Sequence, residues 1–174
     1  MTEDLVNEAF DERHGERGTT LIELVIILGL IGVIAAMTIP AMANAFDRNK
    51  VFMGSELVAA AIRDARLAAI ARNTNYRVRF ECPSAGGVRV LRITGDPTID
   101  TAADRCSTSI ADDGSAMYLP QGVTYGALPM INVNGRGQMS VSSGTMPLNI
   151  TVTYEGFTRT LAVSATGRVT TPGS

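Results

Sequence analysis

The sequence predicts an α+β fold in which a long N-terminal helix, apolar in its first half, packs on an antiparallel β domain. Three observations predict it. No charged residue occurs from Leu24 to Phe46, and apolar residues then recur at steps of three and four as far as Asn73. From Asn75 onward, apolar and polar residues alternate between frequent Gly, Pro, Asn and Ser. The 174 residues suffice for one domain of ordinary size.

Residues 1–18 differ from the rest of the chain in charge. They hold six acids and two bases, a net charge of −4, whereas the whole chain has −2 and the remainder therefore +2. His14, the only histidine, lies in this segment. We expect this segment to be removed, and a mature chain without histidine cannot form a Ser-His-Asp triad, a Cys-His pair or a histidine metal site. The sequence therefore favours a protein that is not an enzyme, with no catalytic residues, no metal ion and no cofactor.

The run Leu21–Ile39 is apolar except for Glu23 and Thr38. Its 19 residues suit a helix that crosses a hydrocarbon core. A secretory signal peptide would be shorter, with basic residues before it and a small-residue cleavage site after it. A buried core helix is the alternative, but so small a domain can hardly wrap this segment on all sides. We expect a membrane-spanning helix in which Gly29 and Gly32 allow close helix approach.

Glu23 is the anomaly of this run, because a carboxylate inside a membrane is costly without a partner. It could reach the interface near the helix end. It could instead neutralise a positive group, either its own N-terminus or one on a neighbouring chain. Further along, Pro40 removes one backbone hydrogen bond and is expected to kink or loosen the helix nearby.

The segment Gly18-Thr19-Thr20-Leu21-Ile22-Glu23-Leu24 resembles the prepilin signature of type IV pilins and type II secretion pseudopilins. The resemblance implies that a prepilin peptidase cuts between Gly18 and Thr19, so that residues 1–18 are a leader peptide and Thr19 becomes an N-methylated terminus. It also implies that Glu23 pairs with the terminal amine of an adjacent subunit during filament assembly. Thr19 replaces the usual Phe, and the leader is acidic where most are basic.

The same resemblance implies location and partners. We expect a single-pass protein of the bacterial inner membrane with a periplasmic C-terminal domain, which enters a pilus or pseudopilus after assembly. Its partners would be other pilin or pseudopilin subunits, the prepilin peptidase, the inner membrane and the assembly platform. Pro40, the twenty-second residue after the cut, resembles the helix-breaking proline of many pilins and favours the pilus. The secretion pseudopilus stays open.

The helix is expected to have two halves, a transmembrane and assembly half over 19–46 and an amphipathic half over 47–74. One face of the second half is predicted to pack in the core rather than to form a partner groove. Its members are Val51, Ser55, Val58, Ile62, Ala65 and Ala69. The polar cluster Asn73-Thr74-Asn75 should end the helix.

Residues 75–174 are predicted to form a β-rich globular domain of six to eight short antiparallel strands. The alternating residues are Tyr76, Val78 and Phe80; Val88, Val90 and Ile93; Val123 and Tyr125; Met139 and Val141; Ile150 and Val152; and Leu161 and Val163. Asn134-Gly135 is a hairpin-turn signal. A long helix packed on such a sheet is the pilin-like architecture.

Cys82 and Cys106 are the only cysteines. Outside the membrane they could form a disulfide that closes a loop of about 25 residues, worth roughly 3 kcal/mol in the chain-entropy model. Two separate thiols are the alternative. The segment between Gly95 and Pro120 carries five aspartates whose spacing matches no calcium-binding loop. We expect a solvated loop there, suited to contacts with other subunits or cargo.

The segments Ile131–Gly137 and Leu161–Val169 resemble the strand-turn-Gly segment and the closing strand of the FimT/GspH family. Some members of that family bind DNA for natural transformation through a C-terminal Gly-Arg-x-Arg motif. Here Arg136 and Arg168 fall at predicted turns, but the second Arg of the motif is missing. The leading interpretation is therefore a minor pilin or pseudopilin of the FimT/GspH type, and a DNA-binding minor pilin is the alternative.

Overall fold

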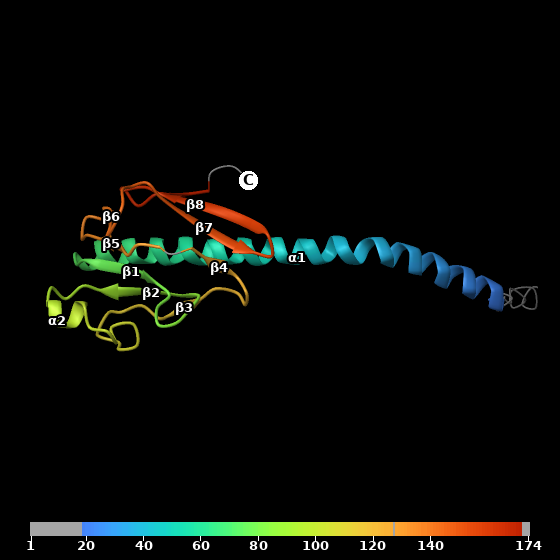
Figure 1. The fold of residues 1–174 in the computed structure, drawn as a ribbon, viewed down its shortest axis with the longest axis horizontal. Helices are drawn as coiled ribbons and strands as arrows, with labels where there is room; N and C mark the ends of the chain where they lie inside the picture. The colour runs from blue at the N-terminus through green and yellow to red at the C-terminus, as the bar shows by residue number, and fades with distance from the viewer. Residues whose placement is uncertain (1–18, 127, 172–174) are drawn as a thin grey trace, which may run out of the picture. The chain divides into compact units, whose positions relative to one another are not determined.

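The computed structural model describes residues 19–126 and 128–171, which form two helices and nine strands. The helices are α1 (Leu21–Arg72) and α2 (Pro97–Asp100). The strands are β1 (Tyr76–Phe80), β2 (Gly87–Arg92), β3 (Met117–Tyr118), β4 (Thr124–Tyr125), β5 (Ile131–Val133), β6 (Met139–Val141), β7 (Leu148–Tyr154), β8 (Phe157–Val163) and β9 (Val169–Thr170). Figure 1 shows these elements, and the predicted α+β class is confirmed.

The chain divides into two compact units, Met1–Met42 and Ala43–Ser174. Helix α1 contributes to both, and every strand belongs to the second unit. The helix runs through Pro40 without a break. The predicted kink at that residue stays a prediction, as does the predicted boundary between residues 46 and 47.

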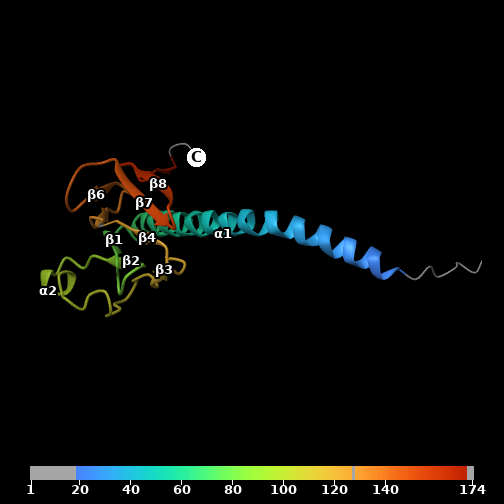
Figure 2. The same ribbon diagram turned by 45° about the vertical axis from the view of Figure 1, so that its right-hand side comes forward.

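Two antiparallel sheets flank the second half of α1 (Figures 1 and 2). The first sheet has the strand order β3-β2-β1-β5-β6, and the second has the order β4-β7-β8-β9. Gly54 of α1 shows how closely the helix approaches its neighbours: a Cβ there would lie 3.0 Å from Val123 and 3.3 Å from Val152. Only a residue without a side chain fits this approach without a shift of its neighbours.

The predicted core face of α1 is confirmed, because all six of its residues are buried. They pack against the inward side chains of both sheets, which include Val78, Ile131, Ile150 and Leu161. The helix ends at Arg72, as the polar cluster predicted. Asn73 then adopts a φ of 48°, a left-handed conformation that asparagine tolerates at this position after a helix.

The predicted alternation is seen in β1, β5 and β7, whereas β2 is buried at five successive positions. The prediction of six to eight strands is too low for the part of the chain that the structure describes. The difference comes from strands of two residues, such as β3 and β9, which are too short to show a period of two. The sequence also gave no sign that the strands divide into two sheets, since that division depends on pairing between distant segments.

Tyr125 links the two sheets. Its hydroxyl donates to the Gly87 carbonyl at 2.6 Å and accepts from the Glu81 amide at 2.9 Å, so β4 of one sheet holds the β1–β2 turn of the other. Burial raises the pKa of Tyr125, which keeps the hydroxyl protonated and able to donate.

We expect Tyr125→Phe to lower the free energy of unfolding by about 1–3 kcal/mol, because the Glu81 amide loses its acceptor inside the protein. Urea titration of the purified chain in an uncharged detergent measures the change. Tyr118→Phe is the matched control, since Tyr118 is 52% exposed and its loss of a hydroxyl should cost less than about 0.5 kcal/mol. Equal losses for the two variants would contradict the bridging role of Tyr125.

Candidate functional site

The apolar half of α1 is largely exposed within the part of the chain that the structure describes. Its most apolar window of 18 residues contains no buried residue, and the helix is long and apolar enough to cross a membrane by length and composition. The exposed fractions of its large apolar side chains range from 82% at Leu21 to 47% at Ile27 and are still 58% at Phe46. The alternative of a buried core helix therefore finds no support, because such a helix would have to be enclosed. An exposed apolar surface of this size indicates a lipid or protein partner.

Glu23 lies in the first turn of this helix. The Glu23 amide donates to Thr20 Oγ1 at 3.4 Å, and the Leu24 amide donates to the Thr20 carbonyl at 3.2 Å, which makes Thr20 the N-cap. Thr-x-x-Glu is a capping-box sequence that sequence reasoning missed. Within residues 19–126 and 128–171, no cation forms an ion pair with the Glu23 carboxylate. Its position therefore favours helix initiation and leaves its charge available to a partner.

Besides Glu23, the residues Thr38, Gly29 and Gly32 interrupt the large apolar side chains of this half of α1. Thr38 Oγ1 donates to the Ile34 carbonyl at 2.8 Å, so its hydroxyl is not left unpaired in an apolar setting. A Cβ built on Gly29 or Gly32 would meet no atom within 4 Å. Because these two glycines have no side chain, the backbone of another helix can approach α1 closely at these positions. Gly18, the residue before the predicted cut, lies outside the described residues, and Thr19, the first described residue, is exposed.

Arg136 and Arg168 lie on two turns, residues 134–138 and 164–168, that have the same hydrogen-bond pattern. In each turn the side chain of the first residue, Asn134 or Ser164, accepts the backbone N–H of the fifth residue, at 3.0 or 3.1 Å. The fourth residue of each is a glycine with a φ of 77° or 78°. This left-handed conformation is the one that a three-residue hairpin loop requires.

Arg66 of α1 packs against both turns. Its Nε donates to the Gly137 carbonyl at 3.3 Å. A Cβ on Gly167 would lie 2.7 Å from Arg66 Cδ, and a Cβ on Gly137 would lie 3.1 Å from Arg66 Nε. The turns are also joined directly, since the Met139 amide donates to the Ala165 carbonyl at 2.7 Å. The structure thus brings together two short motifs that are about 30 residues apart in the sequence, with both arginines exposed.

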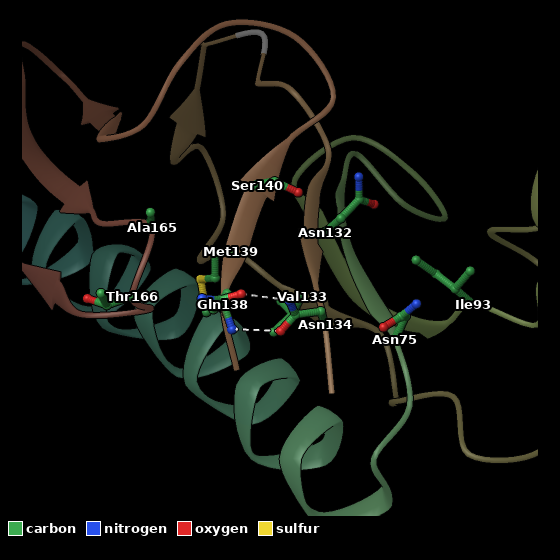
Figure 3. Close-up of a pocket in the computed structure, with 10 residues that line it drawn as sticks. All are labelled: Asn75, Ile93, Asn132, Val133, Asn134, Gln138, Met139, Ser140, Ala165 and Thr166. Carbon is green, nitrogen blue, oxygen red and sulfur yellow. Dashed lines mark hydrogen bonds between the residues drawn. The ribbon is translucent and has the colours of Figure 1, made fainter. Parts of the chain in front are cut away.

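A groove of about 460 Å³ lies beside these turns (Figure 3). Its polar lining consists of amides and hydroxyls from Asn75, Asn132, Asn134, Gln138, Ser140 and Thr166. Figure 3 shows Asn134 and Gln138 joined by hydrogen bonds across the β5–β6 turn, with Thr166 on the neighbouring turn. No carboxylate lines the groove among the described residues. An anion beside it would therefore meet no acidic side chain from the lining.

Cys82 and Cys106 form a disulfide with a Cα–Cα distance of 5.2 Å, rather than two separate thiols. The bond attaches the segment after α2 to the end of β1. Arg89, which is buried on β2, fixes the same segment because its guanidinium donates to the carbonyls of Cys106 and Gly114 and to the Ser109 hydroxyl. Figure 2 shows this segment beyond β2, on the side away from the second sheet.

The prediction that the acidic loop is solvated is wrong for Asp113. Its carboxylate is 1% exposed and makes two hydrogen bonds with the buried Arg105 guanidinium, at 2.7 and 2.8 Å. The amides of Ile110 and Arg92 also donate to it. Asp100 is engaged too, because it accepts from the amides of Thr94 and Gly95 at 2.9 Å. Composition alone could not separate these structural carboxylates from the solvated ones around them.

We expect the domain to lose stability as the pH falls below about 4. Burial opposes the charge of Asp113 and of Asp100, but the bonds from Arg105 and from the backbone amides outweigh it and hold both pKa values below the usual range. A depressed pKa in the folded state stabilises the fold above the unfolded pKa of about 3.9, and this stabilisation is lost as the pH falls through the folded values. Thermal melts between pH 6 and 2 measure it. A melting temperature independent of pH across this range would contradict the prediction.

Residues 19–126 and 128–171 hold no group of three or more His, Cys, Asp or Glu side chains that could bind a metal ion.

Comparisons with known proteins rest on structure, because no protein-family profile and no curated protein match the sequence. The fold is similar to a crystal structure of the type IV minor pilin FimU of Pseudomonas aeruginosa, with a TM-score of 0.51 and 16% identity over 72% of this chain and 90% of the FimU chain. A second crystal form of FimU gives a TM-score of 0.47 and 16% identity over 70% of this chain and 90% of that one. The predicted type IV pilin-like fold is thereby confirmed. The FimT/GspH subtype stays a prediction.

Proposed function

We propose that the chain is a minor pilin or pseudopilin, a structural subunit of a type IV pilus or a type II secretion pseudopilus rather than an enzyme. The observation that carries the proposal is an uncovered apolar helix with one carboxylate, Glu23, in its first turn and no cation beside it among the described residues. The pilin-like fold supports it.

The proposed sequence of events begins in the inner membrane, where the apolar half of α1 spans the bilayer and the β domain faces the periplasm. The prepilin peptidase removes residues 1–18, and the amine of Thr19 is methylated. The assembly platform then moves the subunit into a filament. There the Glu23 carboxylate, which is costly when isolated in a medium of low dielectric, lies beside the terminal amine of an adjacent subunit.

Processing is tested by expressing the chain with and without a prepilin peptidase and measuring the intact mass. We expect an N-terminus at Thr19 only when the peptidase is present, because Gly18 provides the cleavage signal. Gly18→Val is the matched control and should leave the mass unchanged. An N-terminus that stays at Met1 with the active peptidase, or a cut at another bond, would contradict the proposal.

The second candidate function is DNA binding by the assembled subunit. Arg136 and Arg168 favour it, since both are exposed on adjoining turns beside a groove without a carboxylate in its described lining. Guanidinium groups in such a place suit phosphate contacts, although one or two of them give only weak affinity.

Filter binding at two salt concentrations tests this candidate with the full chain in an uncharged detergent. DNA binding requires an affinity that falls with salt and that drops further in Arg168→Ala. Arg63→Gln, which removes an exposed arginine of α1 that pairs with Glu56, is the control. An affinity that is unchanged by Arg168→Ala would exclude DNA contacts at these turns.

A further inference from the structure

Three cations rest on three aromatic rings where α1 meets β7 and β8. Arg48 lies over Phe157 with Cζ 5.3 Å from the ring centroid, and Arg159 lies over Phe52 at 4.5 Å. In the third pair, Lys50 Nζ lies 4.2 Å from the centroid of the Tyr154 ring and donates to its hydroxyl at 2.6 Å. We call these six residues the cation–aromatic surface. The chain has nine aromatic residues and no Trp, so three on one surface is a concentration that composition does not explain.

The two arginines of this surface are not neutralised by carboxylates at close range. Arg48 forms no ion pair within residues 19–126 and 128–171, and the contact of Arg159 with Glu56 is 4.0 Å long. Arg159 Nε is buried and has no hydrogen-bond partner among the described residues. Both arginines line one cleft of about 350 Å³ together with Val51, Phe52, Phe157 and Thr158. The cleft therefore offers guanidinium donors and apolar walls to an incoming group.

Lys50 is less available than the two arginines to bind an incoming group. The hydrogen bond to Tyr154 raises its pKa and holds its ammonium, and the carboxylates of Asp47 and Glu155 lie close enough to act on the same charge. With those two acids, the surface is not a general polybasic patch that attracts any anionic membrane. What it has instead is a pair of planar guanidinium forks, which match the geometry of a phosphate.

The position of this surface along the chain favours a phosphate that belongs to a lipid headgroup. Arg48 and Lys50 are the first two bases after the uncharged run that ends at Phe46. The uncharged run Leu24–Phe46 has 23 residues, about 35 Å of helix, which fits a hydrocarbon core of about 30 Å when the helix is tilted. At about 1.5 Å per residue, the two bases follow the end of this run by roughly 3 and 6 Å along the helix. The headgroup layer of a bilayer is roughly 5–8 Å thick on each side. Basic and aromatic side chains concentrate in this layer.

We propose that Arg48 and Arg159 hold the phosphate of a phospholipid headgroup in this cleft, with Phe52 and Phe157 in the interfacial layer. The contact fixes the β domain on the membrane surface before the subunit is assembled. The inference rests on the proposed function, because it requires the apolar half of α1 to lie in a bilayer. It adds a ligand and two binding residues that the proposed function does not need.

A single tryptophan can report the contact, since the chain has none of its own. We would place it with Phe157→Trp, reconstitute the full chain in phosphatidylglycerol and phosphatidylcholine vesicles, and include lipids with a nitroxide on the headgroup as quenchers. The remote control is Ala165→Trp, because Ala165 is exposed in a turn whose Gly167 packs on Arg66. Arg66 follows Arg48 by roughly 27 Å along α1 at about 1.5 Å per residue. We expect quenching at position 157 to exceed that at position 165 at least threefold.

The arginines are tested in the Phe157→Trp background. Arg48→Gln together with Arg159→Gln should reduce the quenching to the level of Ala165→Trp, whereas Arg79→Gln on the first sheet should leave it unchanged. Arg48 is exposed, so Arg48→Gln alone is the variant that keeps the test valid if loss of Arg159 disturbs the fold. We expect at least a twofold loss from it. Quenching that does not depend on either arginine would overturn the proposal.

Two further measurements separate the possible failures. Flotation of the vesicles with the chain reports membrane insertion, and a chain that does not float contradicts the proposed function itself. A chain that floats without quenching at position 157 contradicts only the lipid contact. Inorganic phosphate added to the chain in maltoside micelles should leave the emission of Phe157→Trp unchanged. An emission shift equal to that seen in vesicles would identify a site for free phosphate and overturn the lipid assignment.

Discussion

Glu23→Ala should reduce the amount of this chain in assembled filaments at least tenfold. Removal of one partner from an ion pair in a medium of low dielectric costs about 3–5 kcal/mol, and each 1.4 kcal/mol corresponds to a tenfold change. Because the Glu23 carboxylate has no ion-pair partner within the described residues, its loss should not affect the fold of the β domain. Sheared filaments and the membrane fraction are quantified by immunoblot.

Two variants make this result interpretable. Glu23→Asp keeps the charge on a shorter side chain and should restore part of the incorporation. Asp64→Ala removes an exposed carboxylate from the second half of the same helix and should leave incorporation at the original level. Incorporation of Glu23→Ala at the same level as Asp64→Ala would show that the charge at Glu23 plays no part in assembly.

Asp113→Asn should lower the free energy of unfolding by about 3–5 kcal/mol, the largest effect that we expect in the β domain. The substitution leaves the Arg105 guanidinium, whose side chain is 3% exposed, without its counter-charge. It also weakens the bonds that the carboxylate accepts from the amides of Ile110 and Arg92. Urea titration in an uncharged detergent measures the loss.

Asp112→Asn is the matched control for this change. Asp112 precedes Asp113 and pairs with Arg72 and Arg92 at 3.4 and 3.2 Å, but its side chain is 39% exposed. Ion pairs with this exposure contribute about 0–1 kcal/mol. If the two variants lost the same stability, the buried pair between Arg105 and Asp113 would not be what holds the loop.

The sequence predicted the helix and its orientation in the core well, because both depend on local spacing. Val58, Ile62, Ala65 and Ala69 recur at steps of three and four and are all completely buried. The end of the helix followed from Asn73, whose tolerance of a left-handed conformation is a property of the residue itself. The N-cap at Thr20, in the capping-box spacing Thr-x-x-Glu, was equally local and could have been recognised from the sequence.

Features that join distant segments could not be predicted in this way. The pairing of Arg105 with Asp113 depends on which of five aspartates turns inward, and their spacing gives no sign of that choice. Gly137 and Gly167 each looked like an ordinary turn glycine. Only the fold shows that Arg66 packs against both of them and thereby joins the two arginine-bearing turns.

The proposed pairing of Glu23 with the amine of a neighbouring subunit is tested most directly by zero-length carbodiimide coupling of sheared filaments, followed by mass spectrometry. Subunits grown with ¹⁴N and ¹⁵N are assembled together so that couplings between chains can be distinguished from couplings within one chain. We predict an amide that joins the Glu23 carboxylate to the N-terminal amine of another subunit, found in filaments and absent from detergent-dispersed subunits. Coupling of Glu23 in filaments only to the Thr19 amine of its own chain would contradict the account.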